Sequence, residues 1–392
     1  TITTPGSPSS GVTGLGIGAN VFQWTLNNGP CANGVTTDQV TITRFDPAAP
    51  VANAGPDQSA CSSSPTATLA GNTPTAPSTG TWSVVSGTAT ITAPNSPTTT
   101  VTALGIGVVT LRWTINNGPC GAPTTDNMTI TVYNANAVTA NAGADQQLCT
   151  PTTITNLAGN TPTPPSTGVW SLVSGSGTIG TPGSPTSGVT GLTVGTNIFR
   201  WTINNGACAN PISTDDVAII VNSNAQGAAN AGADQQACST APNATLTANA
   251  ATSPASGSWT LVSGSGTIAS PTTSTTSVSA MTVGANVFQW NIANGACGNT
   301  NDQVTVLVFD ANNPIANAGP DQNLCTPATS ATMAGSSLIF PATGTWTLVS
   351  GSGTITAPAS PATTITGLGV GANVFRWTVN NGPCANGTTF DE

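Results

Sequence analysis

One short segment occurs five times in this chain and constrains its fold more than any other feature. The first copy is Gly18-Ala-Asn-Val-Phe-Gln-Trp-Thr-Leu-Asn-Asn-Gly-Pro-Cys31, and the last runs from Gly371 to Cys384. The other copies occupy positions 107–120, 195–208 and 284–297, so the closing cysteines recur at nearly equal intervals. The chain is therefore a tandem array of similar units.

Apolar and polar residues alternate within each copy. Phe22, Trp24 and Leu26 would share one face of an extended segment, with Gln23 and Thr25 on the other face. This period of two predicts a half-buried β-strand, followed by an Asn-Gly turn. Similar patterns give about seven short strands per unit and no helical period. The predicted fold is an all-β tandem array of immunoglobulin-like antiparallel β-sandwiches, each with one intradomain disulfide, forming an elongated rod.

The spacing of the motifs predicts five repeats. Residues 1–46 form the C-terminal half of a repeat, residues 47–135, 136–224 and 225–312 form complete repeats, and residues 313–392 form a repeat with a truncated last strand. We interpret the chain as one part of a longer exported polypeptide whose targeting signals lie in other parts.

Charged residues are scarce and have one dominant sign. The chain has four Arg, no Lys and no His, against 13 acidic residues, and its net charge is −9. Without a basic patch it lacks the phosphate contacts on which nucleic-acid binding depends. Without His and Lys it also lacks the usual general bases. The sequence therefore predicts a protein that is not an enzyme, with no catalytic, cofactor-binding or metal-binding residues.

Acidic residues recur at two places in each unit. Asp57 represents the position in the opening segment, and Asp126 represents the position before the last strand. The favoured interpretation is that these carboxylates accept hydrogen bonds from nearby backbone N–H groups at a turn. The alternative is that one Asp of each kind binds Ca²⁺ together with backbone carbonyl oxygens.

Nine cysteines indicate disulfides and an extracellular location. One pairing scheme joins neighbouring cysteines across each unit boundary, for example Cys120 to Cys149. The favoured scheme joins cysteines within one unit, because their separation is identical in every unit and a boundary-crossing bond would have to span a strand and a linker. Cys31 then has no partner. The eight predicted structural cysteines form the pairs Cys61–Cys120, Cys149–Cys208, Cys238–Cys297 and Cys325–Cys384.

One loop departs from the repeat pattern. Leu338, Ile339 and Phe340 stand where two earlier units have Pro-Thr-Ala (residues 74–76) and Pro-Thr-Pro (residues 162–164). Three neighbouring apolar residues on a loop predict a contact. The loop packs either on the adjoining unit or on another chain.

Four segments occur in a fixed order along the units. They are exemplified by Ala52-Asn-Ala-Gly-Pro-Asp-Gln58 followed by Cys61, Gly80-Thr-Trp-Ser83, Gly367-Leu-Gly-Val-Gly371 and Asn380-Asn-Gly-Pro-Cys384. In these segments the chain resembles the PKD-like, immunoglobulin-like tandem repeats of giant Bacteroidota cell-surface adhesins, of the gliding-motility type exported by type IX secretion. The resemblance extends over the whole chain.

The resemblance implies the repetitive stalk of a very large secreted adhesin filament, attached to the outer membrane and active in surface attachment and gliding motility. Its partners would be an abiotic or cellular substratum, reached through distal regions, and the outer-membrane motility and secretion machinery. No nucleic acid, cofactor or membrane insertion by this segment is implied. A structural extracellular filament, or a passive spacer carrying an enzymatic or binding domain elsewhere in the chain, remains an alternative.

Overall fold

The computed structural model describes residues 1–392, which divide into two compact units. The first unit contains residues 1–144, 155–190 and 198–217, and the second contains residues 145–154, 191–197 and 218–392. The predicted repeat 136–224 thus contributes residues to both units. The repeat boundaries remain predictions and serve below as labels for parts of the chain.

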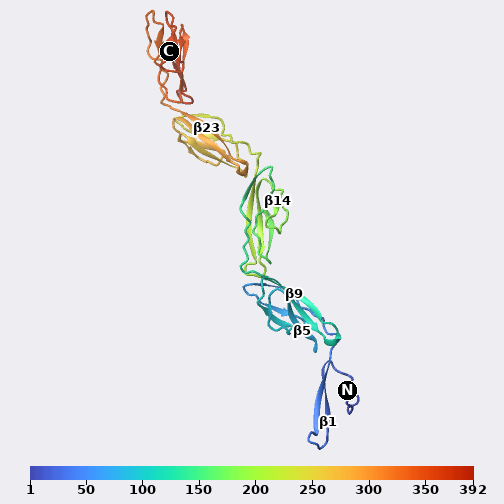
Figure 1. The fold of residues 1–392 in the computed structure, drawn as a ribbon. Coiled ribbons are helices and arrows are strands. Elements are labelled where there is room, and N and C mark those ends of the chain that lie inside the picture. Colours follow the sequence, from blue (N-terminus) through green and yellow to red (C-terminus); the bar gives the residue numbers. More distant parts are fainter. The chain divides into compact units, whose positions relative to one another are not determined.

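Strands make up nearly all the regular structure, and the helices η1 and η2 have three residues each (Figure 1). Residues 1–46 contain β1 (Gly18–Asn27) and β2 (Val35–Arg44). Repeat 47–135 contains β3 (Gln58–Cys61), β4 (Ala67–Ala70), β5 (Thr79–Ser86), β6 (Thr90–Ile91), β7 (Thr98–Thr102), β8 (Gly107–Asn116), η1 (Gly118–Cys120) and β9 (Thr124–Tyr133).

The later repeats follow the same order of elements. Repeat 136–224 contains β10 (Gln146–Cys149), β11 (Thr155–Asn156), β12 (Thr167–Ser174), β13 (Thr178–Ile179), β14 (Gly188–Thr190), β15 (Gly195–Asn204) and β16 (Ile212–Asn222). Repeat 225–312 contains β17 (Gln235–Cys238), β18 (Ala244–Thr247), β19 (Ser256–Ser263), β20 (Thr267–Ile268), β21 (Thr275–Ser279), β22 (Gly284–Ala293), η2 (Gly295–Cys297) and β23 (Thr300–Phe309). Residues 313–392 contain β24 (Ser330–Thr332), β25 (Thr343–Ser350), β26 (Thr354–Ile355), β27 (Thr364–Thr366), β28 (Val374–Asn380) and β29 (Thr388–Asp391).

Two sheets form each complete repeat. In repeat 47–135 one sheet has the order β3-β9-β8-β5 and the other β4-β7-β6, and repeat 225–312 has the same two orders with β17-β23-β22-β19 and β18-β21-β20. Residues from both sheets form one buried apolar cluster. The predicted all-β, immunoglobulin-like sandwich of seven strands is confirmed.

In the four later copies the repeated motif is the central core strand, as its alternation predicts, whereas in the first copy β1 pairs only with β2, and Trp24 and Leu26 are exposed. In β8 the side chains of Leu111, Trp113 and Ile115 are buried. Trp113 packs on Trp82 of β5, with ring centroids 5.1 Å apart, and an equivalent Trp pair occurs in each later repeat. Large aromatic rings in contact supply much of the buried area of a small sandwich, so this pair anchors each core.

The opening strand is shorter than predicted and has the opposite direction. The sequence predicts a strand starting at Val51, but β3 starts at Gln58. It pairs with β9 in parallel rather than antiparallel register, with Cys61 opposite Tyr133. The prediction is wrong here because the residues before Gln58 bond to side chains instead of a neighbouring strand.

Carboxylates hold this opening segment to the last strand. Asp126 Oδ2 accepts a hydrogen bond of 2.8 Å from the Ala54 N–H, and Asp57 Oδ1 accepts one of 2.7 Å from the Thr129 N–H. The same two bonds recur in the next two repeats, at Asp215, Asp145, Asp302 and Asp234. The carboxylates do accept backbone N–H groups, but each partner lies 71 to 73 residues away rather than at a nearby turn. The structure has no group of three or more His, Cys, Asp or Glu side chains that could hold a metal ion.

The core Trp also explains a glycine in the neighbouring strand. A Cβ at Gly168 would collide with Cζ2 and Cη2 of Trp201, which is buried. We expect Gly168→Ala to lower the free energy of unfolding of its repeat by about 1–3 kcal/mol, the usual cost of overpacking a core. Gly183→Ala is the control, because no atom lies within 4 Å of a Cβ at Gly183. Urea unfolding monitored by Trp fluorescence measures the free energy of unfolding of both variants. Equal stability of the two variants would contradict this packing.

Candidate functional site: the junctions between repeats

Three disulfides join consecutive repeats. Their Cα atoms are 4.9 to 5.0 Å apart and their cysteines are 146 to 148 residues apart in sequence. The bonds are Cys61–Cys208, Cys149–Cys297 and Cys238–Cys384. Cys31, Cys120 and Cys325 are free and exposed. The predicted pairs Cys61–Cys120, Cys149–Cys208, Cys238–Cys297 and Cys325–Cys384 are therefore wrong, and so is the alternative pairing of neighbouring cysteines across each boundary.

The direction of the opening strand explains this pairing. Cys61 ends β3 opposite Tyr133, the last residue of β9. Cys120 lies in η1, just before β9 starts at Thr124. The two cysteines of one repeat thus lie near opposite ends of a ten-residue strand, which is about 30 Å long, and no disulfide spans that distance. Their constant spacing in sequence reflects two fixed positions in each repeat rather than a bond between them.

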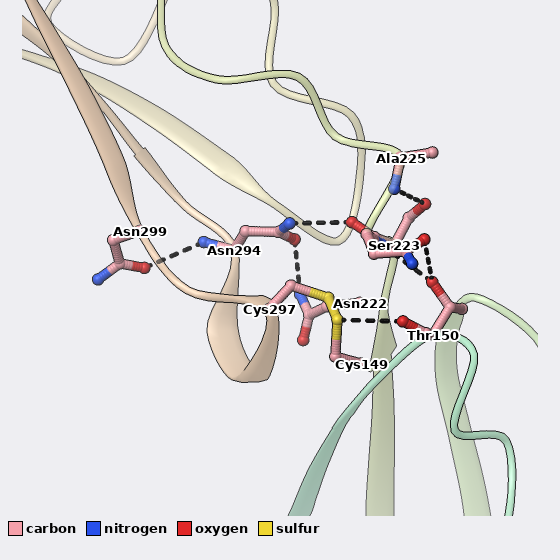
Figure 2. The surroundings of a disulfide bond; sticks show 9 residues. Cys149, Thr150, Asn222, Ser223, Ala225, Asn294, Cys297 and Asn299 are labelled. Atoms are coloured by element: carbon pink, nitrogen blue, oxygen red, sulfur yellow. Dashed lines mark hydrogen bonds between the residues drawn. A yellow bond between two sulfur atoms is a disulfide. The ribbon is translucent and has the colours of Figure 1, made fainter.

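Figure 2 shows one junction, around Cys149–Cys297. Cys149 is the end of β10, and Cys297 comes from η2 of the following repeat. Asn294, which precedes η2, donates from Nδ2 to the Ser223 carbonyl oxygen at 2.9 Å. Asn222 Nδ2 donates to Asn294 Oδ1 at 3.3 Å. Hydrogen bonds of buried amides therefore accompany the covalent bond.

The other junctions combine an aromatic ring with a glycine. The ring of Phe309, the last residue of β23, lies so close to Gly382 that a Cβ there would be 2.6 Å from the ring. Tyr133 has the same relation to Gly206. Each glycine also has a positive φ, 56° at Gly382 and 58° at Gly206, which disfavours other residues. The Asn-Gly turn that follows each motif strand is thus a docking surface for the preceding repeat.

Asparagine side chains tie these turns to the linker. Asn381 Nδ2 donates to the Asp310 carbonyl oxygen at 2.9 Å, and Asn117 Nδ2 donates to the Asp46 carbonyl oxygen at 2.8 Å. These bonds repeat the contact made by Asn294 at the Cys149–Cys297 junction. The Asn before the turn glycine therefore bonds to the backbone between two repeats at three junctions.

The linkers themselves are ordered turns. Asp310 Oδ1 accepts a hydrogen bond of 2.8 Å from the Asn312 N–H, and Asn134 Oδ1 accepts one of 2.9 Å from the Asn136 N–H. Ser62, which follows Cys61, accepts from the Ala135 N–H at 2.9 Å through its Oγ. Each bond restricts the backbone between two repeats.

Sequence reasoning singled out the cysteines but missed the residues that surround them. The aromatic residue at the end of the last strand breaks the alternation, because Val132 and Tyr133, like Val308 and Phe309, are consecutive and apolar. Two consecutive apolar residues just before a linker were the sequence signal that could have identified Tyr133 and Phe309 as junction residues.

The loop Leu338–Phe340 is only partly a surface feature. Leu338 packs against the core of its own repeat. Ile339 and Phe340 are exposed, and the Ile339 N–H donates to Asn313 Oδ1 at 2.9 Å. Leu338 is thus partly buried by its own repeat. A contact made by Leu338, Ile339 and Phe340 remains a prediction.

One ion pair lies on the outer face of the motif strand. Arg200 donates to both carboxylate oxygens of Asp216, at 2.7 and 2.9 Å. This hydrogen bonding is the main reason that the pKa of Asp216 is below its ordinary value. The pair therefore contributes stability above the unfolded-state pKa of about 3.9, and this contribution is lost as the pH falls through the lower folded-state value.

Replacing Arg200 should raise the pKa of Asp216. Gln occupies the equivalent position at Gln289, so Arg200→Gln is compatible with the strand. We expect the NMR titration midpoint of the Asp216 carboxyl to move up toward the ordinary value of about 3.9. Arg112→Gln is the control, since Arg112 bonds to Asn127 in another repeat. An unchanged midpoint in the Arg200 variant would refute the assignment.

Disulfide mapping tests the junctions directly. Free thiols are first alkylated, and pepsin digestion at low pH then avoids disulfide exchange. Mass spectrometry should identify the three bonds between repeats, with alkyl groups on Cys31, Cys120 and Cys325. A peptide pair joined by Cys61 and Cys120 would contradict the structure.

Similarity to known proteins is found among solved structures. No protein-family model matches the chain, and no curated protein does. The chain is similar to titin domains I67–I69 with 12% identity and a TM-score of 0.36, over 65% of this chain and 96% of that one. The PKD domain of the KIAA 1837 protein matches 21% of this chain and 85% of its own length, with 29% identity and a TM-score of 0.19. The human desmocollin-1 ectodomain matches 92% of this chain and 82% of its own, with 11% identity and a TM-score of 0.26.

The sheets and the disulfides define the class of the repeats. No helix of the structure has the length and apolar character needed to cross a membrane. The chain consists of immunoglobulin-like β-sandwich repeats, and disulfides join three pairs of consecutive repeats.

Proposed function

We propose that this chain is part of the repetitive stalk of a very large secreted cell-surface adhesin and acts in surface attachment, without enzymatic activity. The observation that carries the proposal is the set of three disulfides between consecutive repeats. A binding or catalytic module needs only its own fold to be stable. A bond placed between folded repeats instead resists their separation, which is a mechanical requirement.

The disulfides shorten the covalent path along which tension passes. A pull between Cys61 and Cys384 crosses from Cys61 to Cys208, follows the backbone to Cys149, crosses to Cys297, follows the backbone to Cys238 and crosses to Cys384. The linkers lie outside this path. Unfolding under load therefore releases little chain, which suits a stalk that transmits force.

The assignment to type IX secretion, outer-membrane attachment and gliding depends on the family resemblance described in the sequence analysis. The repeats resemble those of Bacteroidota gliding-motility adhesins, which supports type IX secretion, outer-membrane attachment and a role in gliding. The substratum would be bound by distal regions and the secretion and motility machinery by other parts of the polypeptide. An elongated arrangement of the repeats is part of this proposal.

Single-molecule pulling tests the mechanical role. When the chain is held at Cys61 and Cys384, full extension of the oxidised protein should release only the segments 149–208 and 238–297, about 400 Å in total. The reduced protein should release the whole chain between the two attachment points, about 1,100 Å. Equal extension in both states would refute the proposed force path.

A genetic experiment tests the biological role. Deleting the gene in its source organism should abolish adhesion to glass and colony spreading, and a copy lacking the six bonded cysteines should restore them only under weak flow. A deletion strain that adheres and spreads normally would refute the adhesin assignment. Loss of an enzymatic activity alone would instead favour a spacer that carries a catalytic domain.

A further inference from the structure

The indole N–H of the motif Trp has an acceptor in three repeats and none in repeat 225–312. In those three repeats it donates to an oxygen of the loop before the neighbouring strand, at 3.1 to 3.3 Å, in the pairs Trp113–Asn72, Trp201–Asn160 and Trp377–Ser336. Trp290 is 1% exposed, and its Nε1–H is buried without a hydrogen-bond partner. Because an unpartnered buried donor lowers stability, an acceptor that reaches this indole is bound favourably.

The same repeat also lacks the side chain that lies beside this indole elsewhere. In three repeats a Cβ on the glycine of the neighbouring strand would be 2.9 Å from a loop side chain, in the pairs Gly80–Pro74, Gly168–Pro162 and Gly344–Leu338. At Gly257 of β19 the three nearest atoms all belong to Trp290. Ala251 stands as far before Gly257 in the sequence as Pro74 does before Gly80. A methyl group therefore stands here in place of a ring or a leucine side chain.

A pocket of about 440 Å³ lies at this place in repeat 225–312. Its lining comes from the loop before β19, from β19 itself, from the segment 272–274 and from Trp290. Apart from Trp290, every lining residue is Ala, Ser, Thr or Gly. The pocket therefore has small, uncharged walls and suits an uncharged group about the size of the missing side chain.

The loop over the indole can shift without losing a hydrogen bond. Asn249 and Thr252 are each held by a hydrogen bond, of 2.9 and 2.6 Å. Ala250 and Ala251 lie between them and make no hydrogen bond. A small displacement of these two residues opens a way to the buried Nε1–H of Trp290 at little cost in stability.

The other repeats show which chemistry fills this space. In repeat 47–135 the segment Asn72-Thr-Pro74 supplies a carbonyl oxygen to the indole N–H and, two residues later, a proline ring beside Gly80. The segment Asn160-Thr-Pro162 does the same in the next repeat. A proline ring is rigid and uncharged, so it loses little conformational freedom when it packs beside an aromatic side chain.

We propose that the pocket beside Trp290 binds a proline-containing peptide segment of a partner protein. The proline ring occupies the space between Ala251 and Gly257. The carbonyl oxygen two residues before it accepts a hydrogen bond from the Trp290 Nε1–H once the loop has shifted. The partner is a different polypeptide rather than a second copy, because both Asn-Thr-Pro segments of this chain are packed within their own repeats. The site goes beyond the stalk function and does not depend on it.

The test uses the whole oxidised chain with ¹⁵N-labelled Trp and the peptide acetyl-Asn-Thr-Pro-Thr-amide as the probe. During the titration the Trp290 indole N–H signal should move to higher proton frequency and saturate, because a new hydrogen bond deshields its proton. The Trp290→Phe variant assigns this signal. The peptide acetyl-Asn-Thr-Ala-Thr-amide should bind about tenfold more weakly, since it lacks the buried ring.

Two variants exchange the pocket between repeats. Ala251→Pro supplies the ring from within and should abolish the response of Trp290 to the peptide. Pro74→Ala opens the equivalent space in repeat 47–135 and should make the Trp113 signal respond as well. The remaining indole signals show in each variant that the fold is retained.

Three results would overturn the proposal. The first is a Trp290 signal that does not move up to the solubility limit of the peptide. The second is an equal response in the Ala251→Pro variant or to the peptide without proline. The third is saturable binding of a pyranose such as glucose in place of the peptide. None of these results affects the stalk function proposed above, because the pulling experiment depends only on the disulfides.

Discussion

The parallel pairing of the opening segment with the last strand determines the rest of the architecture. Because β3 runs in the same direction as β9, it carries Cys61 to the end of the repeat where the chain leaves. There the turn of the following repeat brings Cys208 within bonding distance. The carboxylates of Asp57 and Asp126 hold the segment in this position. An antiparallel opening strand would place the same cysteine at the far end of the sheet, where no neighbouring repeat could reach it.

Local patterns predicted the core well. The alternation of Leu111, Trp113 and Ile115 identified a buried central strand, because side chains of a strand alternate between its faces whatever its partners are. The direction of β3 and the partner of Cys61 depend instead on contacts with residues far away in the sequence. A single sequence carries no direct record of such contacts. The constant spacing between the two cysteines of a unit therefore suggested a bond within the repeat. This spacing reflects only that the two cysteines occupy fixed positions in every repeat.

The non-covalent contacts that accompany the disulfides differ from junction to junction. A flat ring packs against a glycine at Tyr133 and Phe309, whereas Asn222 occupies this place at the Cys149–Cys297 junction and donates to Asn294. The disulfide is common to all three junctions. Non-covalent contacts can therefore change from junction to junction while the bond keeps the repeats attached.

The three disulfide loops overlap in sequence, and this has a consequence for the survival of the molecule outside a cell. The loop closed by Cys61 and Cys208 overlaps the one closed by Cys149 and Cys297, which overlaps the one ending at Cys384. Every peptide bond between Cys61 and Cys384 is thus enclosed by at least one loop. A protease that cuts once anywhere in this region leaves a single covalent molecule. At least two cuts are needed to release a fragment, and two cuts do so only when both fall between the same two neighbouring bonded cysteines. The array therefore tolerates isolated damage that would sever an ordinary chain of domains.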